Sequence, residues 1–219
     1  MTGIIVAMNN EAETLLSQMR ITKEQCLLNK KVYEGEFENE KIVLIISGIG
    51  KVNAAVSTQF IIDKYKVDKL LNFGLAGGIG KGIEIGDIYF VEKAVQYDFD
   101  LSLLNNVEIG RLEEFDDKYI NVTTIKGSEF GLKKLATGDR FNEDKNDEKL
   151  LVEYMKADLR DMEGGAVAQV AVMNNKPFYM VKAVSDKIEK DSISSYFEQS
   201  RFALKKLKEK MKDIFTVIK

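Results

Sequence analysis

Short apolar runs rich in β-branched residues alternate with helix-type segments along this chain, and the alternation restricts the fold classes open to it. The first run, residues 3–8, leads directly into a helix-type segment, and either asparagine at 9–10 is a suitable helix N-cap. Buried-type strands are also expected at 69–73, 87–95 and 178–184. This alternation predicts an α/β fold with a central mixed sheet that helices cover on both faces.

The remaining segments extend the same pattern and contain no boundary that would divide the chain into domains. They are a hairpin over 31–37 and 41–47, helices over 52–65, about 146–156 and 164–173, a strand near 120–126, an extended polar loop over 100–119 and a long C-terminal helix. No linker, repeat or low-complexity segment divides the chain, so residues 1–219 are predicted to form a single domain. A chain of this length buries enough core to fold without disulfides or a structural metal.

The chain contains no histidine and a single cysteine, Cys26. Histidine is the commonest general acid-base and metal ligand, so its absence excludes Ser-His-Asp and Cys-His hydrolytic arrangements and argues against zinc and copper sites. We therefore expect no metal and no cofactor, and carboxylates remain the principal groups for acid-base chemistry. The lone cysteine and the lack of a signal segment predict a reducing, cytoplasmic setting.

The charge pattern points to a small molecule as the partner. The net charge is −3, whereas a nucleic-acid footprint normally shows as a basic face or stripe. The lysines of 205–212 alternate with apolar residues at helical spacing, which is typical of the solvated face of an amphipathic helix. No apolar run approaches the roughly 20 residues that cross a bilayer. Neither nucleic acid nor membrane is expected to bind.

Polar residues that follow strands are the natural places for a ligand, because open α/β sheets bind ligands beyond their strand ends. Five such places occur: Met8–Glu11, Ser47–Gly50, Gly74–Gly80, Met162–Glu163 and Val184–Asp186. Their glycines lack the spacing of a dinucleotide or P-loop phosphate cradle. They fit sharp turns, or a flat ligand that approaches the backbone, equally well.

The acids within these segments each have an ordinary structural explanation. Glu11 and Glu163 fit the first turn of a helix, where a carboxylate complements the helix dipole. Asp186 fits a residue that caps the turn after its strand. Spacing alone therefore assigns none of the three a catalytic role.

The order of the segments is more specific than any one of them. They are GIIVAMNNE (3–11), SGIGKV (47–52), GDI (86–88), DME (161–163) and AVSD (183–186). Together they resemble the 5′-methylthioadenosine/S-adenosylhomocysteine nucleosidases of the wider nucleoside phosphorylase family. The resemblance implies a three-layer α/β/α sandwich, usually a homodimer, that hydrolyses the N-glycosidic bond of 5′-thio-substituted adenosines to adenine and a thioribose.

The resemblance also implies a role for each acid. Glu11 would orient and deprotonate the attacking water, and Glu163 would bind the ribose hydroxyls. Asp186, positioned by Ser185, would act at N7 of adenine. These residue types suit the reaction, because glycosidic cleavage develops positive charge on the sugar and negative charge on the departing base. An ionised Glu163 favours the first, and a protonated Asp186 neutralises the second.

Apolar surfaces must hold the base and the thioether. The resemblance assigns them to Ile49, Phe141, Met162 and Tyr196, with Phe141 able to stack on adenine. Gly77 in the glycine-rich segment is expected to border the substrate, and Asn142 is expected to contact the base edge.

Some positions depart from the family pattern and keep alternatives open. Leu75 stands where a small hydroxyl residue is expected, and Lys182 stands where many relatives have arginine. A phosphorylase of the same fold needs clustered cations, yet the chain has only five arginines, so a multi-arginine phosphate clamp around Arg140 is not expected. A nucleosidase for deoxyadenosine or futalosine, or a nucleoside-binding regulator without turnover, also fits the three acids.

Overall fold

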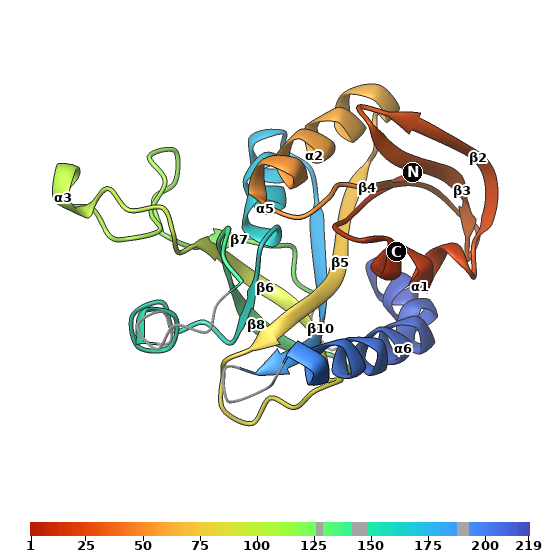
Figure 1. The fold of residues 1–219 in the computed structure, drawn as a ribbon. Coiled ribbons are helices and arrows are strands. Elements are labelled where there is room, and N and C mark those ends of the chain that lie inside the picture. Colours follow the sequence, from red (N-terminus) through yellow and green to blue (C-terminus); the bar gives the residue numbers. More distant parts are fainter. Residues whose placement is uncertain (126–128, 142–148, 188–192) are drawn as a thin grey trace.

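A computed structural model of the chain describes residues 1–125, 129–141, 149–187 and 193–219, which form a mixed β-sheet with helices on both faces (Figure 1). The strands are β1 (Thr2–Val6), β2 (Arg20–Leu27), β3 (Lys30–Phe37), β4 (Glu40–Ile46), β5 (Lys69–Gly78), β6 (Ile88–Gln96), β7 (Ile120–Asn121), β8 (Gly131–Thr137), β9 (Leu159–Asp161) and β10 (Phe178–Lys187). The helices are α1 (Asn9–Leu16), α2 (Lys51–Tyr65), α3 (Ser102–Asn105), α5 (Gly164–Met173) and α6 (Ile193–Ile218), with a π-helical stretch at Lys149–Tyr154.

Alternate side chains of the central strands enter two separate cores. In β1, Ile5 packs into the core beneath α2 and α5, whereas its neighbour Ile4 packs into the core beneath α1 and α6. Leu70 and Leu71 of β5 divide in the same way. Because strand side chains point to opposite faces in turn, an apolar run buries both faces of the sheet. The predicted α/β/α layering is confirmed (Figure 1).

The sheet is mixed, as predicted, and it also closes on itself. At one end, β1 lies between the parallel strands β4 and β5, and β3 and β2 extend the sheet by antiparallel pairing. At the other end, β5 pairs with both β10 and β9, and β6 and β8 complete a ring of five strands. This ring brings β5, β9 and β10 together at one edge, where the predicted site segments lie.

The structure extends or adds strands where the sequence gives a weak signal. β5 continues beyond the predicted 69–73 because its glycine-rich half pairs with β10 as far as Gly78. β2, β8 and β9 were not predicted. The side chains of β2 are almost all exposed, so the strand lacks the apolar alternation that marks a half-buried strand. Its position comes from pairing with β3.

Three other expectations are corrected. The strand expected near 120–126 is reduced to the two residues of β7, and residue 126 lies outside the described residues. The expected helix at about 146–156 is the π-helical stretch Lys149–Tyr154, with 146–148 outside the described residues. The N-cap of α1 is Met8 and neither asparagine.

The predicted loop over 100–119 is largely irregular and carries the short helix α3, which projects from the body of the molecule (Figure 1). Its Leu103 and Leu104 side chains are fully or largely exposed. Across the described ranges, no helix is both long enough and apolar enough to span a bilayer.

Candidate active site

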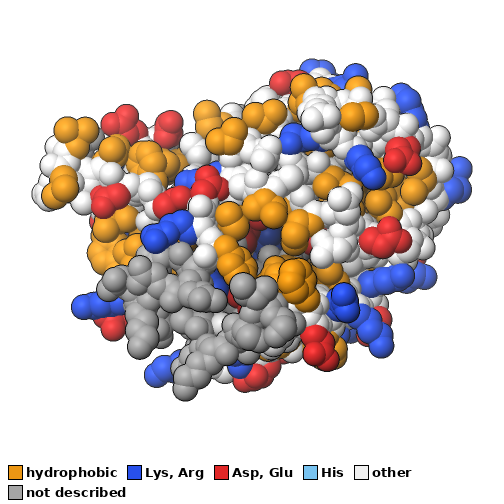
Figure 2. All heavy atoms as spheres, viewed as in Figure 1, with side chains coloured by type: hydrophobic (Ala, Val, Ile, Leu, Met, Phe, Trp, Pro, Cys, Tyr) orange, Lys and Arg blue, Asp and Glu red, His pale blue; other side chains and the backbone are white. Residues whose placement is uncertain are grey.

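A pocket opens beyond the carboxyl ends of β1, β5 and β10, where the ring of strands meets the start of α5. Figure 2 shows a hollow ringed by hydrophobic side chains on the face that it presents. The pocket is lined by Ala7, Met8, Glu11, Ile49, Leu75, Ala76, Gly77, Tyr97, Arg140, Phe141, Arg160, Asp161, Met162, Glu163, Ser185, Asp186 and Tyr196.

The structure brings the predicted site residues together around this pocket. Those that line it are Glu11, Ile49, Gly77, Phe141, Met162, Glu163, Ser185, Asp186 and Tyr196. Asn142 lies outside the described residues. Segments separated by as much as 185 positions in the chain, from Glu11 to Tyr196, therefore face one space, while the role of each remains a prediction.

Glu11 is a buried carboxylate, with only 3% of the residue exposed, and not the solvated first-turn acid that its position allowed. Its side chain folds back so that Oε2 accepts hydrogen bonds from the backbone N–H groups of Ala7 at 3.0 Å and Met8 at 2.9 Å. These bonds satisfy the N–H groups of the two residues between β1 and α1 and fix the carboxylate beside the end of β1.

The other oxygen of Glu11 reaches across to β5. Oε1 accepts a hydrogen bond from the backbone N–H of Leu75 at 2.8 Å, so the contact does not depend on the leucine side chain. A Cβ at Gly74 would lie 2.3 Å from Oε1, which is closer than side-chain carbons come. Burial raises the pKa of Glu11, and the three N–H donors and Lys182 oppose the rise.

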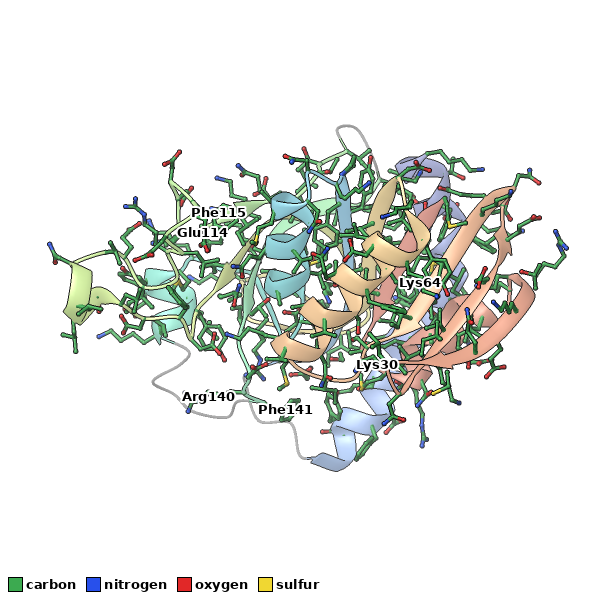
Figure 3. The ribbon with its side chains drawn as sticks, turned by 90° about the horizontal axis from the view of Figure 1, so that it is seen from above. Lys30, Lys64, Glu114, Phe115, Arg140 and Phe141 are labelled. Carbon is green, nitrogen blue, oxygen red and sulfur yellow. The ribbon has the colours of Figure 1, made fainter. Side chains whose placement is uncertain are left out.

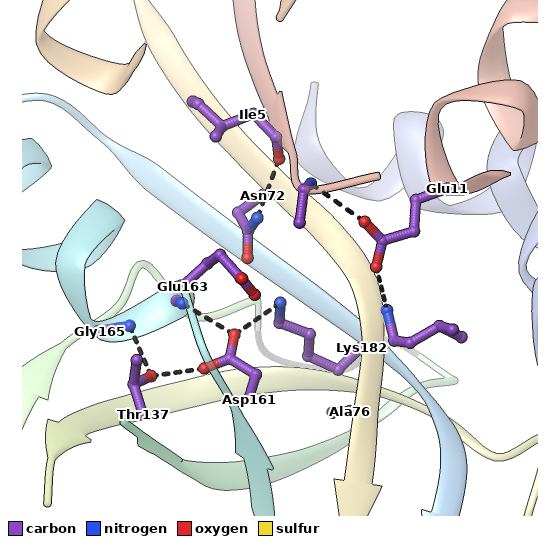
Figure 4. Close-up of polar contacts among 12 residues, drawn as sticks. Ile5, Glu11, Asn72, Ala76, Thr137, Asp161, Glu163, Gly165 and Lys182 are labelled. Atoms are coloured by element: carbon purple, nitrogen blue, oxygen red, sulfur yellow. Dashed lines mark hydrogen bonds and ion pairs between the residues drawn. The ribbon is translucent and has the colours of Figure 1, made fainter. Parts of the chain in front are cut away.

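Lys182 of β10 forms the centre of the charged cluster below the pocket (Figure 4). Its Nζ lies 2.8 Å from Oδ2 of Asp161 in an ion pair whose side chains are 2% and 1% exposed. Burial opposes the charged form of Lys182, but the nearby charges of Asp161 and Glu163 outweigh it and hold its pKa above the usual value. The lysine charge is thus stabilised by surrounding carboxylates.

Asp161 anchors this cluster to the backbone. Its Oδ1 accepts a hydrogen bond from Thr137 Oγ1 at 2.6 Å, and its Oδ2 accepts one from the Gly164 N–H at 2.8 Å. Thr137 Oγ1 in turn accepts from the Gly165 N–H at 2.7 Å (Figure 4). Two N–H groups at the start of α5 are therefore satisfied by side chains from β8 and β9.

Glu163 is the N-cap residue of α5 and is 8% exposed. Its Oε1 accepts a hydrogen bond from the Gly50 N–H at 2.8 Å, and Gly50 has a φ of +100°, a conformation that favours glycine. Burial and the charge of Asp161 raise the pKa of Glu163 to about 7, with Lys182 opposing the rise. A carboxyl group that changes charge near neutral pH therefore faces the pocket.

Asp186 follows a break in the β10–β5 register between Val184 and Asp186, an irregularity of the kind that re-aims side chains near active sites. Its Oδ1 accepts a hydrogen bond from Ser185 Oγ at 2.6 Å. Its Oδ2 accepts one from Arg160 Nη2 at 3.1 Å, an ion pair in which both side chains are largely buried.

Gly77 lies against this ion pair. A Cβ at this position would be 2.7 Å from Nε of Arg160 and 2.9 Å from Oδ2 of Asp186. The glycine therefore leaves room for the guanidinium and the carboxylate to meet, in addition to bordering the pocket.

The outer part of the pocket is apolar and exposed. Ile49 is 53% exposed and Phe141 is 61% exposed. The Phe141 and Tyr196 rings meet edge to face, with centroids 5.3 Å apart. Figure 3 shows Arg140 and Phe141 next to one another on the loop that follows β8. These side chains can contact a flat apolar ligand without any change in the sheet.

Sequence reasoning missed several residues of the pocket. Asp161 was recognised only as part of a motif, although it holds Lys182, and Tyr97 and Arg160 were not singled out. A charged residue next to the Asp-Met-Glu motif is the one weak signal for Arg160. Its ion-pair partner, Asp186, lies 26 positions away in the chain.

Comparisons with known proteins agree with the fold that carries this pocket. The phosphorylase superfamily model matches residues 2–218. The 5′-methylthioadenosine/S-adenosylhomocysteine nucleosidase of Bacillus subtilis is 31% identical over 206 residues, which cover 89% of each chain.

Solved structures agree as well. The chain is similar to the nucleosidase of the same name from Neisseria meningitidis, solved in complex with methylthio-immucillin-A, with a TM-score of 0.86, 27% identity and 95% of each chain covered. It is also similar to futalosine hydrolase of Helicobacter pylori, with a TM-score of 0.84, 26% identity and 97% of each chain covered.

Proposed function

Because this chain belongs to the 5′-methylthioadenosine/S-adenosylhomocysteine nucleosidase family within the phosphorylase superfamily, we propose that it hydrolyses the N-glycosidic bond of those two nucleosides. The products are adenine and the corresponding thioribose. The observation that carries the proposal is the convergence of Glu11, Glu163 and Asp186 on one pocket.

Glu11 acts on the attacking water. Its carboxylate is fixed by backbone N–H groups on both oxygens, so it is oriented before substrate arrives. Burial raises its pKa, which makes the ionised form a stronger base toward water. Water held by Glu11 attacks the anomeric carbon while Glu11 takes its proton.

Glu163 binds the ribose hydroxyls and favours the cationic sugar. Its Oε1 is held by the Gly50 N–H, which keeps the carboxylate aimed at one place in the pocket. When ionised, it supplies negative charge close to the positive charge that develops as the bond to the base breaks.

Asp186 acts at N7 of the departing base. Ser185 donates a hydrogen bond to one of its oxygens and so holds its orientation. Lys182, which is ion-paired with Asp161 beneath these groups, supplies a positive charge that favours the ionised forms of Glu11 and Glu163.

The apolar rim holds the base and the thioether. Phe141 and Tyr196, whose rings meet edge to face, line the pocket, and Ile49 and Met162 add aliphatic surface. Their exposure supports a role in binding, because a bound nucleoside would cover apolar area that water now reaches.

We further propose that the chain acts as a homodimer in the cytoplasm, without a cofactor. The exposed Leu103 and Leu104 of α3 support the dimer, as do Val52 and Val56 on the outer side of α2, because such apolar surface marks interfaces. The free, exposed Cys26 supports a reducing compartment.

A test of the activity incubates the protein with 5′-methylthioadenosine and S-adenosylhomocysteine, with and without phosphate, and follows free adenine by chromatography. We expect adenine from both nucleosides at rates that do not depend on phosphate. Release that requires phosphate would identify a phosphorylase, and binding without release would identify a regulator.

Futalosine hydrolysis is a second candidate, favoured by the similarity to futalosine hydrolase of Helicobacter pylori. Futalosine in the same assay separates the two. A kcat/KM for futalosine above that for 5′-methylthioadenosine would make it the preferred substrate.

A further inference from the structure

Arg160 introduces a guanidinium into the part of the pocket where the base is expected. It belongs to β9, lines the pocket and lies 3.1 Å from Oδ2 of Asp186, the group assigned to N7 of the base. Its side chain is 13% exposed, so the charge is mostly removed from water. Arg160 has no role in the mechanism proposed above.

The ion pair changes what the base pocket offers. With Ser185 donating to Oδ1 and Arg160 to Oδ2, the Asp186 carboxylate accepts on both oxygens. Because Arg160 also lines the pocket, its guanidinium is a donor beside the position assigned to N7. A guanidinium is a planar fork of five N–H donors, and it can hold a carboxylate and a base edge at the same time.

Purines differ at the edge that such a fork would contact. All present N7 as an acceptor, but adenine carries an amino donor at C6, whereas a 6-oxopurine carries an acceptor oxygen there. A bidentate contact from arginine to N7 and O6 is the commonest specific arginine–purine contact. Adenine offers Arg160 one acceptor, N7, and its amino group can donate to the Asp186 carboxylate. A 6-oxopurine offers Arg160 two acceptors, N7 and O6.

We propose that Arg160 is a specificity-determining residue that contacts the base and lets this pocket cleave 5′-thio-substituted 6-oxopurine nucleosides as well as their adenine counterparts. The inference rests on the proposed nucleosidase function and names an additional substrate class for the same site. It gives Gly77 a purpose as well, because a side chain there would separate Arg160 from Asp186.

The chemical step balances without a proton from Asp186. The water oxygen bonds to the anomeric carbon and gives one proton to Glu11. The bond from the anomeric carbon to N9 breaks, and its electron pair leaves with the purine, which departs as a monoanion. That negative charge spreads toward N7 and O6, beside the Arg160 guanidinium. The purine then takes up one proton from solvent, and Glu11 releases one.

The test measures kcat/KM for 5′-methylthioinosine and 5′-methylthioadenosine in wild type, Arg160→Met and Arg160→Lys, with hypoxanthine and adenine resolved by chromatography. Methionine keeps an unbranched stem and removes every donor, while lysine keeps the charge and loses the fork. Arg20→Met is the matched control, because Arg20 forms an exposed ion pair with Glu36 on β2 and β3, outside the residues that line the pocket.

Wild type is expected to release hypoxanthine from 5′-methylthioinosine. Arg160→Met is expected to lower the inosine-to-adenosine ratio of kcat/KM at least about tenfold, the size of a lost bidentate base contact, and Arg20→Met to leave it unchanged. Calorimetric titration with the free bases should show that Arg160→Met weakens the binding of hypoxanthine more than the binding of adenine.

No hypoxanthine from wild type, or a ratio that falls by less than about tenfold, overturns the inference. If Arg160→Met does not fold, Arg160→Lys decides: a lower ratio supports the inference and an unchanged ratio overturns it. If one of these outcomes overturns the inference while wild type still releases adenine from 5′-methylthioadenosine, the proposed function stands and only this inference fails. If no base is released from any nucleoside, the proposed function itself has failed.

Discussion

The two ends of the pocket are built in opposite ways. The inner wall, formed by Glu11, Asp161 and Glu163 with Lys182 beneath them, consists of charged side chains that the protein already surrounds with partners. The outer rim, formed by Ile49, Phe141 and Tyr196, consists of apolar side chains that are partly or largely exposed. The inner wall is fixed by the fold, whereas the rim is accessible to water.

This difference follows from the cost of burial. A charge removed from water is tolerated only with paired charges and hydrogen bonds, so the inner wall must be organised in the unliganded protein. An exposed apolar side chain costs little by itself and gains when a ligand covers it. Changes in the inner wall should therefore affect stability and turnover, and changes in the rim should affect binding.

The largest expected effect is the loss of the buried cation. Lys182→Met leaves Asp161 without its ion-pair partner at a site closed to water, and we expect a loss of about 3–5 kcal/mol in the free energy of unfolding. Urea denaturation measures it. Lys187→Met on the same strand removes the exposed pair with Glu84 and should cost about 0–1 kcal/mol. Equal losses in the two variants would contradict the contrast between inner wall and surface.

Turnover should respond next. Glu11→Gln should lower kcat at least about a hundredfold with the fold intact, as expected for a general base. Asp186→Asn should lower kcat by a similar factor, because it breaks the ion pair with Arg160 beside the position assigned to N7. Base release by chromatography, with circular dichroism as a check on folding, gives the result. Glu13→Gln, an exposed acid on the same helix as Glu11, is the control and should behave as wild type. A near-normal rate in either of the first two variants would remove that residue from the mechanism.

The pKa of Glu163 gives the inner wall a pH signature. Its pKa is about 7 in the folded protein, above the usual 4.5, so between pH 4.5 and 7 the folded state binds more protons than the unfolded state. This group therefore lowers stability as pH rises through that window, by at most about 3 kcal/mol. Urea unfolding at several pH values should show a smaller decline for Glu163→Gln than for wild type. Parallel curves would rule out the raised pKa.

The rim should give the smallest effect. Phe141→Ala should raise KM roughly two- to tenfold, the range expected from the loss of one aromatic contact, and leave kcat close to wild type. Its unfolding free energy should change by no more than about 0.5 kcal/mol, because the side chain is exposed. Phe197→Ala is matched to it, since Phe197 also meets the Tyr196 ring but does not line the pocket. A kcat that falls with KM unchanged would place Phe141 in the chemistry.

The sequence predicted the parts of the fold that burial determines. The start of α5 at Gly164 and the hairpin of β3 and β4 agree closely with expectation, because apolar periodicity and turn residues mark them. β2 was missed because its side chains are solvated, and β9 because three residues carry no period. Both exist through pairing with strands distant in the chain, which local patterns do not contain.

The site shows the same division. Ordered motifs led to Glu11, Glu163 and Asp186, and the structure places all three at one pocket. The contacts that set their environments, from Lys182 to Asp161 and from Arg160 to Asp186, join residues 21 and 26 positions apart across the closed ring of strands. A single sequence does not reveal which charges meet across such a ring.

The most direct test of the contrast between the two ends is a crystal structure of Glu11→Gln with 5′-methylthioadenosine bound. We expect ribose hydroxyls within hydrogen-bond distance of Glu163, the anomeric carbon facing residue 11, N7 beside Asp186 and Arg160, and the rim side chains covering apolar parts of the nucleoside. A ligand whose base occupies the inner wall, with its ribose at the rim, would contradict it.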